Sequence, residues 1–230
     1  MRISELKSKI HEKLFTKLSA LPFKELRPSQ EKAIKAGLLE GKNLLICTPT
    51  GSGKTLAAEI AALNAIYSKR SKALYIVPLK ALATEKYKDF KRKYPDIKVA
   101  LSIGDQDASD GYLAEYDLII TVSEKLDSLL RHHCPWLKFV NVVIVDEIHL
   151  LNDPSRGPTL EVVITLLRML IKEVQLIGLS ATIGNPTELA SWLNAQLVED
   201  SWRPVELHHG IYREGAIEFY PQIINDTIKA

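Results

Sequence analysis

The chain has 230 residues, of which 46% are hydrophobic and 25% are charged, a composition typical of a globular protein with a sizeable core. Its 30 basic and 28 acidic residues leave a net charge of only +2, so binding of a polyanion through overall charge is excluded. No apolar run approaches the roughly 20 residues that span a membrane, and the first residues lack a signal-peptide core, so we expect a cytoplasmic protein without a membrane partner.

The first predicted element is a helix over residues 4–20. Its evidence is one apolar stripe of residues four apart: Leu6, Ile10, Leu14 and Leu18. Pro22 ends this helix. Pro28 then opens a second predicted helix, from Ser29 to about Leu39, and Gly41 stops it.

Short apolar runs then alternate with helix-length segments. The predicted strands are Leu44–Cys47, Ala73–Val77, Val99–Ile103, Leu118–Thr121, Val142–Val145 and Leu176–Leu179. The predicted helices are Lys54–Lys69, Leu79–Lys93, Ser123–His132, Pro158–Lys172 and one near Pro186–Ala195. Continuous Val- and Ile-rich runs suit strands that are buried on both faces. The alternation therefore predicts an α/β domain with a central, mostly parallel sheet and helices on both faces.

The end of the chain has weaker patterning. One further strand is predicted over residues 202–207, and residues 213–230 resemble a linker or tail. The two cysteines, Cys47 and Cys134, are interpreted as free buried thiols, because no group of Cys and His has the spacing of a zinc site.

The strongest motif lies between the first predicted strand and the helix that follows it. It reads Thr48, Pro49, Thr50, Gly51, Ser52, Gly53, Lys54 and Thr55, the arrangement of a phosphate-binding P-loop. The glycines let backbone N–H groups turn toward the phosphates, and the helix N-terminus adds a partial positive charge. Lys54 is expected to reach the β- and γ-phosphates and the Thr55 hydroxyl to hold Mg²⁺.

Two features weigh against a simple match. Glycine is usual in the general pattern where Thr48 stands, and Gly-Ser-Gly is common in ordinary loops. However, Gly-Lys-Thr between a buried strand and a helix favours nucleotide binding over an unspecialised turn.

A second motif, Asp146-Glu-Ile-His149, directly follows four β-branched residues of a predicted strand. Alone, two carboxylates at a strand end can simply cap a turn. Beside a P-loop, Asp146 can hold Mg²⁺ through its water shell, and Glu147 can orient or deprotonate the attacking water. Lys54, Asp146 and Glu147 are therefore the candidate catalytic residues, and Thr55 with Asp146 is the candidate metal site.

The polar motifs share one position in the predicted fold, since each follows a strand. They are 48–55, 78–81, 104–107, 121–125, 146–149 and 180–182. Ligands of parallel α/β sheets bind outside the carboxyl ends of the strands, so these segments are expected to converge on one edge.

In this order the motifs resemble those of superfamily 2 DExH-box helicases. Gln30 is similar to the Q motif that reads adenine, and 48–55 to motif I, in which Ala is usual where Thr48 stands. Further similarities are with motifs Ia (77–82), Ib (121–126), II (146–149) and III (180–182). The resemblance implies a RecA-like ATP-binding domain with ATP and Mg²⁺ as cofactors.

Longer segments are most similar to archaeal Hjm-type (Ski-like) DNA helicases: 146–151, 156–161, 179–186 and 201–205. This resemblance implies a 3′–5′ DNA helicase that acts on forked or branched DNA in repair or recombination, with a related RNA helicase as the alternative. It divides the chain into an N-terminal helix (1–20), the first RecA-like domain (21–212) and a linker (213–230).

The same resemblance implies missing parts. Such helicases bind ATP between two RecA-like domains, and the second domain supplies arginines that contact the γ-phosphate. No motif after Thr182 matches that domain, and winged-helix and ratchet domains are missing too. An arginine finger is typically worth about 10³–10⁵ in rate, so the chain is expected to bind ATP but hydrolyse it weakly alone.

The resemblance also assigns coupling and nucleic-acid roles. His149 is expected to link the γ-phosphate site to Ser180 and Thr182, although these hydroxyls can instead cap the next helix. Single-stranded or forked DNA is expected to contact residues at five positions: Lys80, Gly104, Thr121, Lys125 and Arg156. Each of these lysines can equally be an ordinary solvated side chain.

Two other classes of protein remain as alternatives. Another P-loop NTPase, such as a switch or a kinase, explains Lys54 and Asp146 but not Gln30 together with motifs II and III. A non-catalytic module that kept the fold is disfavoured, because Lys54, Thr55, Asp146 and Glu147 are all intact.

Overall fold

The computed structural model describes residues 1–69, 71–104, 111–132, 134–206, 208 and 210–219. Its centre is a seven-stranded sheet in the order β3-β4-β2-β5-β6-β1-β7, and every pairing in it is parallel. The strands are β1 (Leu44–Cys47), β2 (Lys72–Val77), β3 (Val99–Ser102), β4 (Leu118–Val122), β5 (Val140–Val145), β6 (Gln175–Ser180) and β7 (Gln196–Glu199). The predicted α/β class with a parallel sheet is confirmed.

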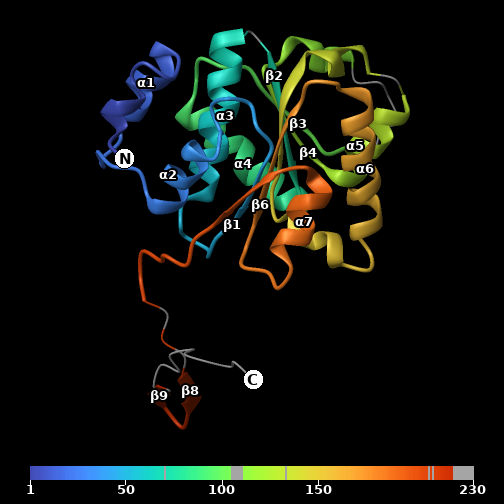
Figure 1. Ribbon diagram of the computed structural model, residues 1–230. Coiled ribbons are helices and arrows are strands. Elements are labelled where there is room, and N and C mark those ends of the chain that lie inside the picture. Colours follow the sequence, from blue (N-terminus) through green and yellow to red (C-terminus); the bar gives the residue numbers. More distant parts are fainter. Residues whose placement is uncertain (70, 105–110, 133, 207, 209, 220–230) are drawn as a thin grey trace.

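Helices cover both faces of the sheet (Figure 1). One layer consists of η1 (Ile3–Leu6), α1 (Glu12–Ser19), α2 (Pro28–Lys35), α3 (Lys54–Lys69) and α4 (Lys80–Lys93). The other layer consists of α5 (Ser123–Arg131), α6 (Gly157–Leu170) and α7 (Pro186–Leu193), with the short turns η2 (Gly111–Glu115), η3 (Pro135–Phe139) and η4 (Ile148–Asn152).

The sheet has a hydrophobic core on each face, and alternate residues of a strand pack into one core or the other. In β2, Tyr75 packs with the α1–α4 layer, whereas Leu74 and Ile76 pack with the α5–α7 layer. Successive side chains of a strand point to opposite faces, so a strand buried on both faces must be apolar throughout. This explains why the strands appear in the sequence as continuous apolar runs.

The predicted helix over residues 4–20 is wrong in its continuity. The chain forms η1, breaks, and resumes as α1, although Leu6 and Leu14 of the stripe are fully buried. His11 caps α1 by accepting a hydrogen bond from Lys13 N at 3.2 Å, and its own backbone N donates to Asn64 Oδ1 at 2.9 Å. These contacts fix residue 11 in an extended conformation and interrupt the helix.

The second helix ends earlier than predicted, at Lys35 rather than near Leu39. Gly37 has a φ of +104°, which an L side chain rarely adopts, and its N–H donates to Ile34 O. Leu38 N also bonds back to Ala33 O. Gly37 therefore terminates the helix, and Gly41 lies in the turn before β1.

The strand predicted over residues 202–207 is wrong for its described part, because residues 202–206 form no strand. The last strand of the sheet is β7, which pairs with the outer side of β1. Only Val198 of β7 is buried, as expected for an edge strand, and two apolar residues in a row, Leu197 and Val198, gave little signal.

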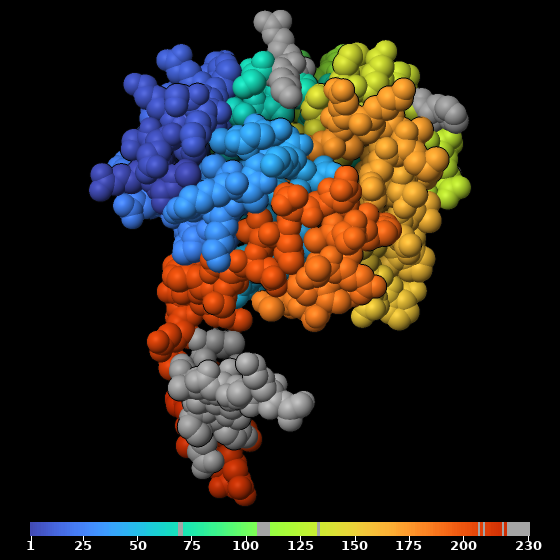
Figure 2. Space-filling model, in the orientation of Figure 1, coloured from blue at the N-terminus to red at the C-terminus, as the bar shows by residue number. Residues whose placement is uncertain are grey.

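An antiparallel hairpin follows the sheet, formed by β8 (Gly210–Arg213) and β9 (Ala216–Phe219). Its two-residue turn, Glu214 and Gly215, has positive φ at both positions, as a type I′ hairpin turn requires. The hairpin overlaps the predicted linker over 213–230, whose residues 220–230 lie outside the described part. Figure 2 shows the segment after β7 projecting from the body of the domain.

The two thiols agree with the prediction, since Cys47 and Cys134 are both free and buried. Burial, helped by the nearby Glu199 carboxylate, raises the pKa of Cys47 to about 11. Within the described part of the chain, no helix has both the length and the apolar character needed to cross a membrane.

Candidate nucleotide site

The predicted P-loop connects the end of β1 to the start of α3. Thr48 N donates to Ser180 O at 3.2 Å, which ties the beginning of the loop to the end of β6. Asp146 N donates to Ile76 O at 2.8 Å, which ties the acidic motif after β5 to β2. The motifs after four strands therefore lie along one edge of the sheet, as predicted from the sequence.

The conformation of the loop depends on its glycines. Gly51 and Gly53 have φ values of +82° and +95°, in the region that favours glycine. Ser52 is fully buried, and its Oγ lies 2.7 Å from the Thr48 hydroxyl. Thr48, which stands where the general pattern has glycine, thus uses its hydroxyl to connect the start of the loop to Ser52.

Lys54 is nearly buried at the N-terminus of α3. Its Nζ lies 3.5 Å from Thr48 O, so the side chain folds back over the loop. An ammonium group beside inward-turning backbone amides is suited to bind phosphate oxygens.

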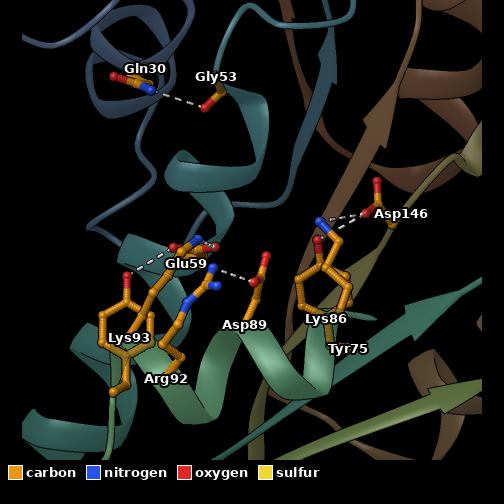
Figure 3. Close-up of polar contacts among 10 residues, drawn as sticks. Gln30, Gly53, Glu59, Tyr75, Lys86, Asp89, Arg92, Lys93 and Asp146 are labelled. Carbon is orange, nitrogen blue, oxygen red and sulfur yellow. Dashed lines mark hydrogen bonds and ion pairs between the residues drawn. The ribbon is translucent and has the colours of Figure 1, made fainter. Parts of the chain in front are cut away.

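Three consecutive loop carbonyls accept hydrogen bonds from the segment that opens α2. Arg27 Nη1 donates to Gly51 O, and Ser29 Oγ donates to Ser52 O at 2.9 Å. Gln30 Nε2 donates to Gly53 O at 3.0 Å (Figure 3). The sequence predicted a base-reading role for Gln30; the structure adds that this side chain also supports the phosphate loop.

A cavity of about 300 Å³ opens beside Gln30. Its walls include Leu21, Phe23, Gly53, Thr55, Leu56 and Glu59. Phe23 is 38% exposed, and a flat aromatic base can stack on an exposed aromatic ring. Sequence reasoning missed Phe23, because an isolated Phe between two predicted helices carries no motif.

The carboxylate of Asp146 is held from two sides. Its Oδ2 accepts a hydrogen bond from Tyr75 OH at 2.9 Å and lies 3.4 Å from Lys86 Nζ (Figure 3). Its Oδ1 accepts from Glu147 N at 3.1 Å. Burial, and then the Asp146 charge, raise the pKa of Tyr75 well above its usual value, so the phenol stays protonated as a donor. Neither partner was found from the sequence.

Glu147 has a left-handed backbone, with φ of +50°. A non-glycine residue in this region typically costs about 1–3 kcal/mol and is often found at functional sites. Glu147 Oε2 lies 3.4 Å from His149 Nδ1, which in turn lies 3.5 Å from Ser180 Oγ. The structure therefore brings together two of the three predicted coupling residues, His149 and Ser180.

Thr182, the third predicted coupling residue, is exposed two positions beyond the end of β6. The alternative role as helix caps does not hold for Ser180 or Thr182. The next helix, α7, begins at Pro186 and has Asn185 at its N-cap.

The donors at this edge fit Mg²⁺. Among the described residues there is no cluster of three or more His, Cys, Asp or Glu that could form an all-protein metal cage. Mg²⁺ typically binds through one or two protein oxygens together with water and substrate phosphates. Asp146 and the Thr55 hydroxyl offer this kind of donor set.

The five predicted nucleic-acid residues have different environments. Lys80 and Gly104 are exposed, at the start of α4 and just after β3. Arg156 is partly buried and lines a small cleft with Pro78, Ser123 and Glu147, which joins motifs Ia and Ib to motif II. Residues 105–107 of the predicted contact segment lie outside the described part.

Two of these residues have buried side chains. Thr121 is fully buried, and its hydroxyl donates to Ser102 O at 2.7 Å, so it joins β4 to β3. Lys125 is only 7% exposed within α5, so its contact with a strand stays a prediction. The sequence placed both after a strand, but it could not show which way their side chains point.

Several archaeal proteins are similar to this chain, and each is named an ATP-dependent DNA helicase Hel308. The protein of Methanocaldococcus jannaschii is 57% identical over 85% of this chain, and that of Pyrococcus horikoshii is 49% identical over 94%. The alignments cover 17% and 30% of those relatives, so the chain spans less than a third of their length. The predicted resemblance to archaeal DNA helicases is confirmed.

Solved helicase structures share the fold. DUF1998 helicase MrfA superposes with a TM-score of 0.73 at 29% identity, covering 83% of this chain and 33% of that one. Mycobacterium smegmatis helicase Lhr, bound to ssDNA and AMP-PNP, gives 0.70 at 30% identity, covering 84% and 28%. The model of the DEAD/DEAH box helicase family matches residues 27–189. This match, together with the phosphate loop and the acidic motif, shows that the chain belongs to the DEAD/DEAH box helicase family.

Proposed function

We propose that this chain is the ATP-binding motor domain of an ATP-dependent 3′–5′ DNA helicase that acts on forked or branched DNA in repair or recombination. The observation that carries the proposal is the phosphate loop, with Lys54 folded over it, on the same sheet edge as Asp146 and Glu147. The names of the archaeal relatives support DNA rather than RNA as the substrate.

In this proposal different residues bind the phosphates, the adenine, the metal ion and the attacking water. The loop 48–53 and Lys54 bind the phosphates, while Gln30 and Phe23 hold the adenine in the adjacent cavity. Thr55 and Asp146 would hold Mg²⁺, which neutralises charge on the phosphates when bound. Glu147 orients the attacking water and takes its proton, and its contact with His149 transmits the event toward Ser180.

The nucleic-acid track follows the same edge. In this proposal Lys80, Gly104 and Arg156 contact the phosphates of a single strand, and backbone amides supply the remaining contacts. Its support is that Lys80 and Gly104 are exposed and that Arg156 lines the cleft beside Glu147. We expect the full track to need further domains: a second RecA-like domain and accessory domains. The motor domain proper comprises residues 21–212. The first 20 residues pack on it, since Leu14 and Leu18 share its core and Lys17 pairs with Asp96 at 2.7 Å.

The proposal predicts that the chain binds ATP but hydrolyses it slowly on its own. The pure chain is mixed with ATP and Mg²⁺, and phosphate release is followed without nucleic acid and with single-stranded DNA or RNA of equal sequence. We expect slow release, because the second domain's arginine contributes about 10³–10⁵ in rate. Glu147→Gln should bind ATP normally and abolish the residual release.

Two results would contradict the proposal in different ways. Fast, DNA-stimulated release by the pure chain would mean that it supplies its own arginine, for instance by dimerising. Stimulation by RNA but not by DNA would instead support the motor domain of a related RNA helicase.

A further inference from the structure

Lys86 and Tyr75 converge on a single oxygen atom of the acidic motif. Lys86 Nζ lies 3.4 Å from Asp146 Oδ2, and Tyr75 OH donates to the same atom at 2.9 Å. The ammonium group also lies over the Tyr75 ring, 5.4 Å from its centroid. Figure 3 shows the three side chains meeting from α4, β2 and the end of β5.

This arrangement differs from a surface ion pair. The side chains of Lys86 and Asp146 are 22% and 10% exposed, and Tyr75 is fully buried. A carboxylate removed from water needs a compensating charge, which Lys86 supplies. It also needs hydrogen bonds to fix its direction, one of which Tyr75 supplies.

Asp146 is also the carboxylate that a divalent cation would use. An ammonium group and Mg²⁺ near one carboxylate repel each other, and the repulsion is only partly screened at a site with little exposure. The affinity for the metal therefore depends on whether the ammonium stays at Asp146.

The end of α4 beyond Lys86 contacts both β2 and α3. At the far end of the helix, Lys93 Nζ lies 3.3 Å from Glu59 Oε1, and Tyr94 OH donates to Glu59 Oε2 at 2.8 Å. Phe90 packs between Tyr75 and Tyr94, with ring centroids 5.8 and 5.7 Å apart. Because the helix packs against both β2 and α3, we expect the flexible Lys86 side chain, rather than the helix, to withdraw the ammonium group from Asp146 when a metal binds.

We propose that Lys86 is a positioning residue that competes with Mg²⁺ for the carboxylate of Asp146, while Tyr75 fixes the orientation of that carboxylate. The inference rests on the proposed function, because it concerns the metal site of that function. Lys86 and Tyr75 both contact Asp146 Oδ2, but the inference assigns them opposite effects: loss of Lys86 strengthens metal binding, and loss of Tyr75 weakens it.

The test measures metal affinity rather than turnover. Mn²⁺ is titrated into the whole chain with a saturating non-hydrolysable ATP analogue, and bound metal is measured by electron paramagnetic resonance. Lys86→Met should tighten Mn²⁺ binding by about three- to tenfold, from the removed repulsion. Tyr75→Phe should weaken it by about tenfold or more, the usual effect of losing a hydrogen bond to a metal ligand.

Two control variants separate charge from packing. Lys86→Arg keeps the positive charge, so the repulsion persists and Mn²⁺ binding should not tighten. Lys88→Met removes a charge from an exposed position of the same helix and should change nothing. Lys86→Gln replaces Lys86→Met if that variant does not fold, as judged by its thermal unfolding.

The outcomes distinguish this inference from the proposed function. Unchanged or weaker Mn²⁺ binding in the folded Lys86 variants would overturn the competition. Weaker binding of the analogue in the absence of metal would show instead that Lys86 contacts a phosphate, and would overturn it too. If the wild-type chain binds neither analogue nor metal, the proposed function fails, and the role of Lys86 fails with it.

Discussion

The proposed nucleotide side and the proposed nucleic-acid side of the sheet edge are built differently. On the nucleotide side, three consecutive loop carbonyls accept hydrogen bonds from the start of α2, and the Asp146 carboxylate is held by Tyr75 and Lys86. On the nucleic-acid side, Lys80 and Gly104 are exposed, while Thr121 and Lys125 are buried. The first side is a connected network around the phosphate loop and Asp146, whereas the second combines exposed and buried residues from different elements.

The difference follows from what each ligand requires. A phosphate group in a P-loop needs several donors at fixed positions, so the loop must be rigid before the ligand arrives. A single strand is gripped by many weak contacts spread along its backbone, and each can be supplied by a different domain. A lone motor domain is therefore expected to have a complete nucleotide site and only part of a strand site.

The largest effect should come from a methyl group added on the nucleotide side. In Gly53→Ala the new Cβ would collide with Gln30 Nε2 and lie 3.1 Å from Arg27 Cδ, at a φ of +95°. We expect the free energy of unfolding to fall by about 1–3 kcal/mol, measured by urea denaturation, and nucleotide binding to weaken strongly.

Gly104→Ala is the matched change on the nucleic-acid side. A Cβ at Gly104 meets no atom within 4 Å, so stability and nucleotide binding should stay unchanged. Equal losses in the two variants would contradict the distinction between a rigid and an open side.

A smaller effect is expected at Gln30. Gln30→Ala removes the side-chain amide that donates to Gly53 O and lines the cavity of about 300 Å³. ATP affinity should fall about three- to tenfold, the usual worth of one hydrogen bond, and the preference for ATP over GTP should shrink. Competition titrations with both nucleotides measure this, with the exposed Gln196→Ala as the control. An unchanged preference would remove Gln30 from base recognition.

The smallest effect should come from the exposed lysine of α4. Lys80→Ala should weaken binding of single-stranded DNA modestly and lower the salt dependence of the affinity by about one unit of slope. Lys88→Ala, on the same helix, and the buried Lys125→Ala should both leave that slope unchanged. Fluorescence anisotropy over a series of salt concentrations gives the slopes, and a drop with Lys125→Ala would show that this buried lysine does contact the strand.

The two sides also differ in how much the sequence could predict. The P-loop and the acidic motif are short contiguous segments, so their chemistry was visible without the fold. Tyr75 and Lys86 meet Asp146 across 71 and 60 residues of sequence, and only the sheet order brings them together. The buried directions of Thr121 and Lys125 likewise depend on packing that no local pattern contains.

Errors in the predicted elements have the same origin. The first helix breaks because residue 11 bonds to Asn64, which lies 53 positions away. Strand β7 was missed because an edge strand needs only one buried residue. The continuous apolar strands, in contrast, were located to within a residue or two, because burial on both faces demands an apolar residue at every position.

The most direct test of the central claim is an equilibrium titration of a fluorescent ATP analogue with Mg²⁺ against the wild-type chain and Lys54→Met. If the phosphate loop is a complete nucleotide site, the wild type binds, and the variant loses about ten- to a hundredfold in affinity, the worth of a charged contact to phosphate. Equal binding by both chains would mean that the analogue binds elsewhere, and would contradict the assignment of this edge as the nucleotide site.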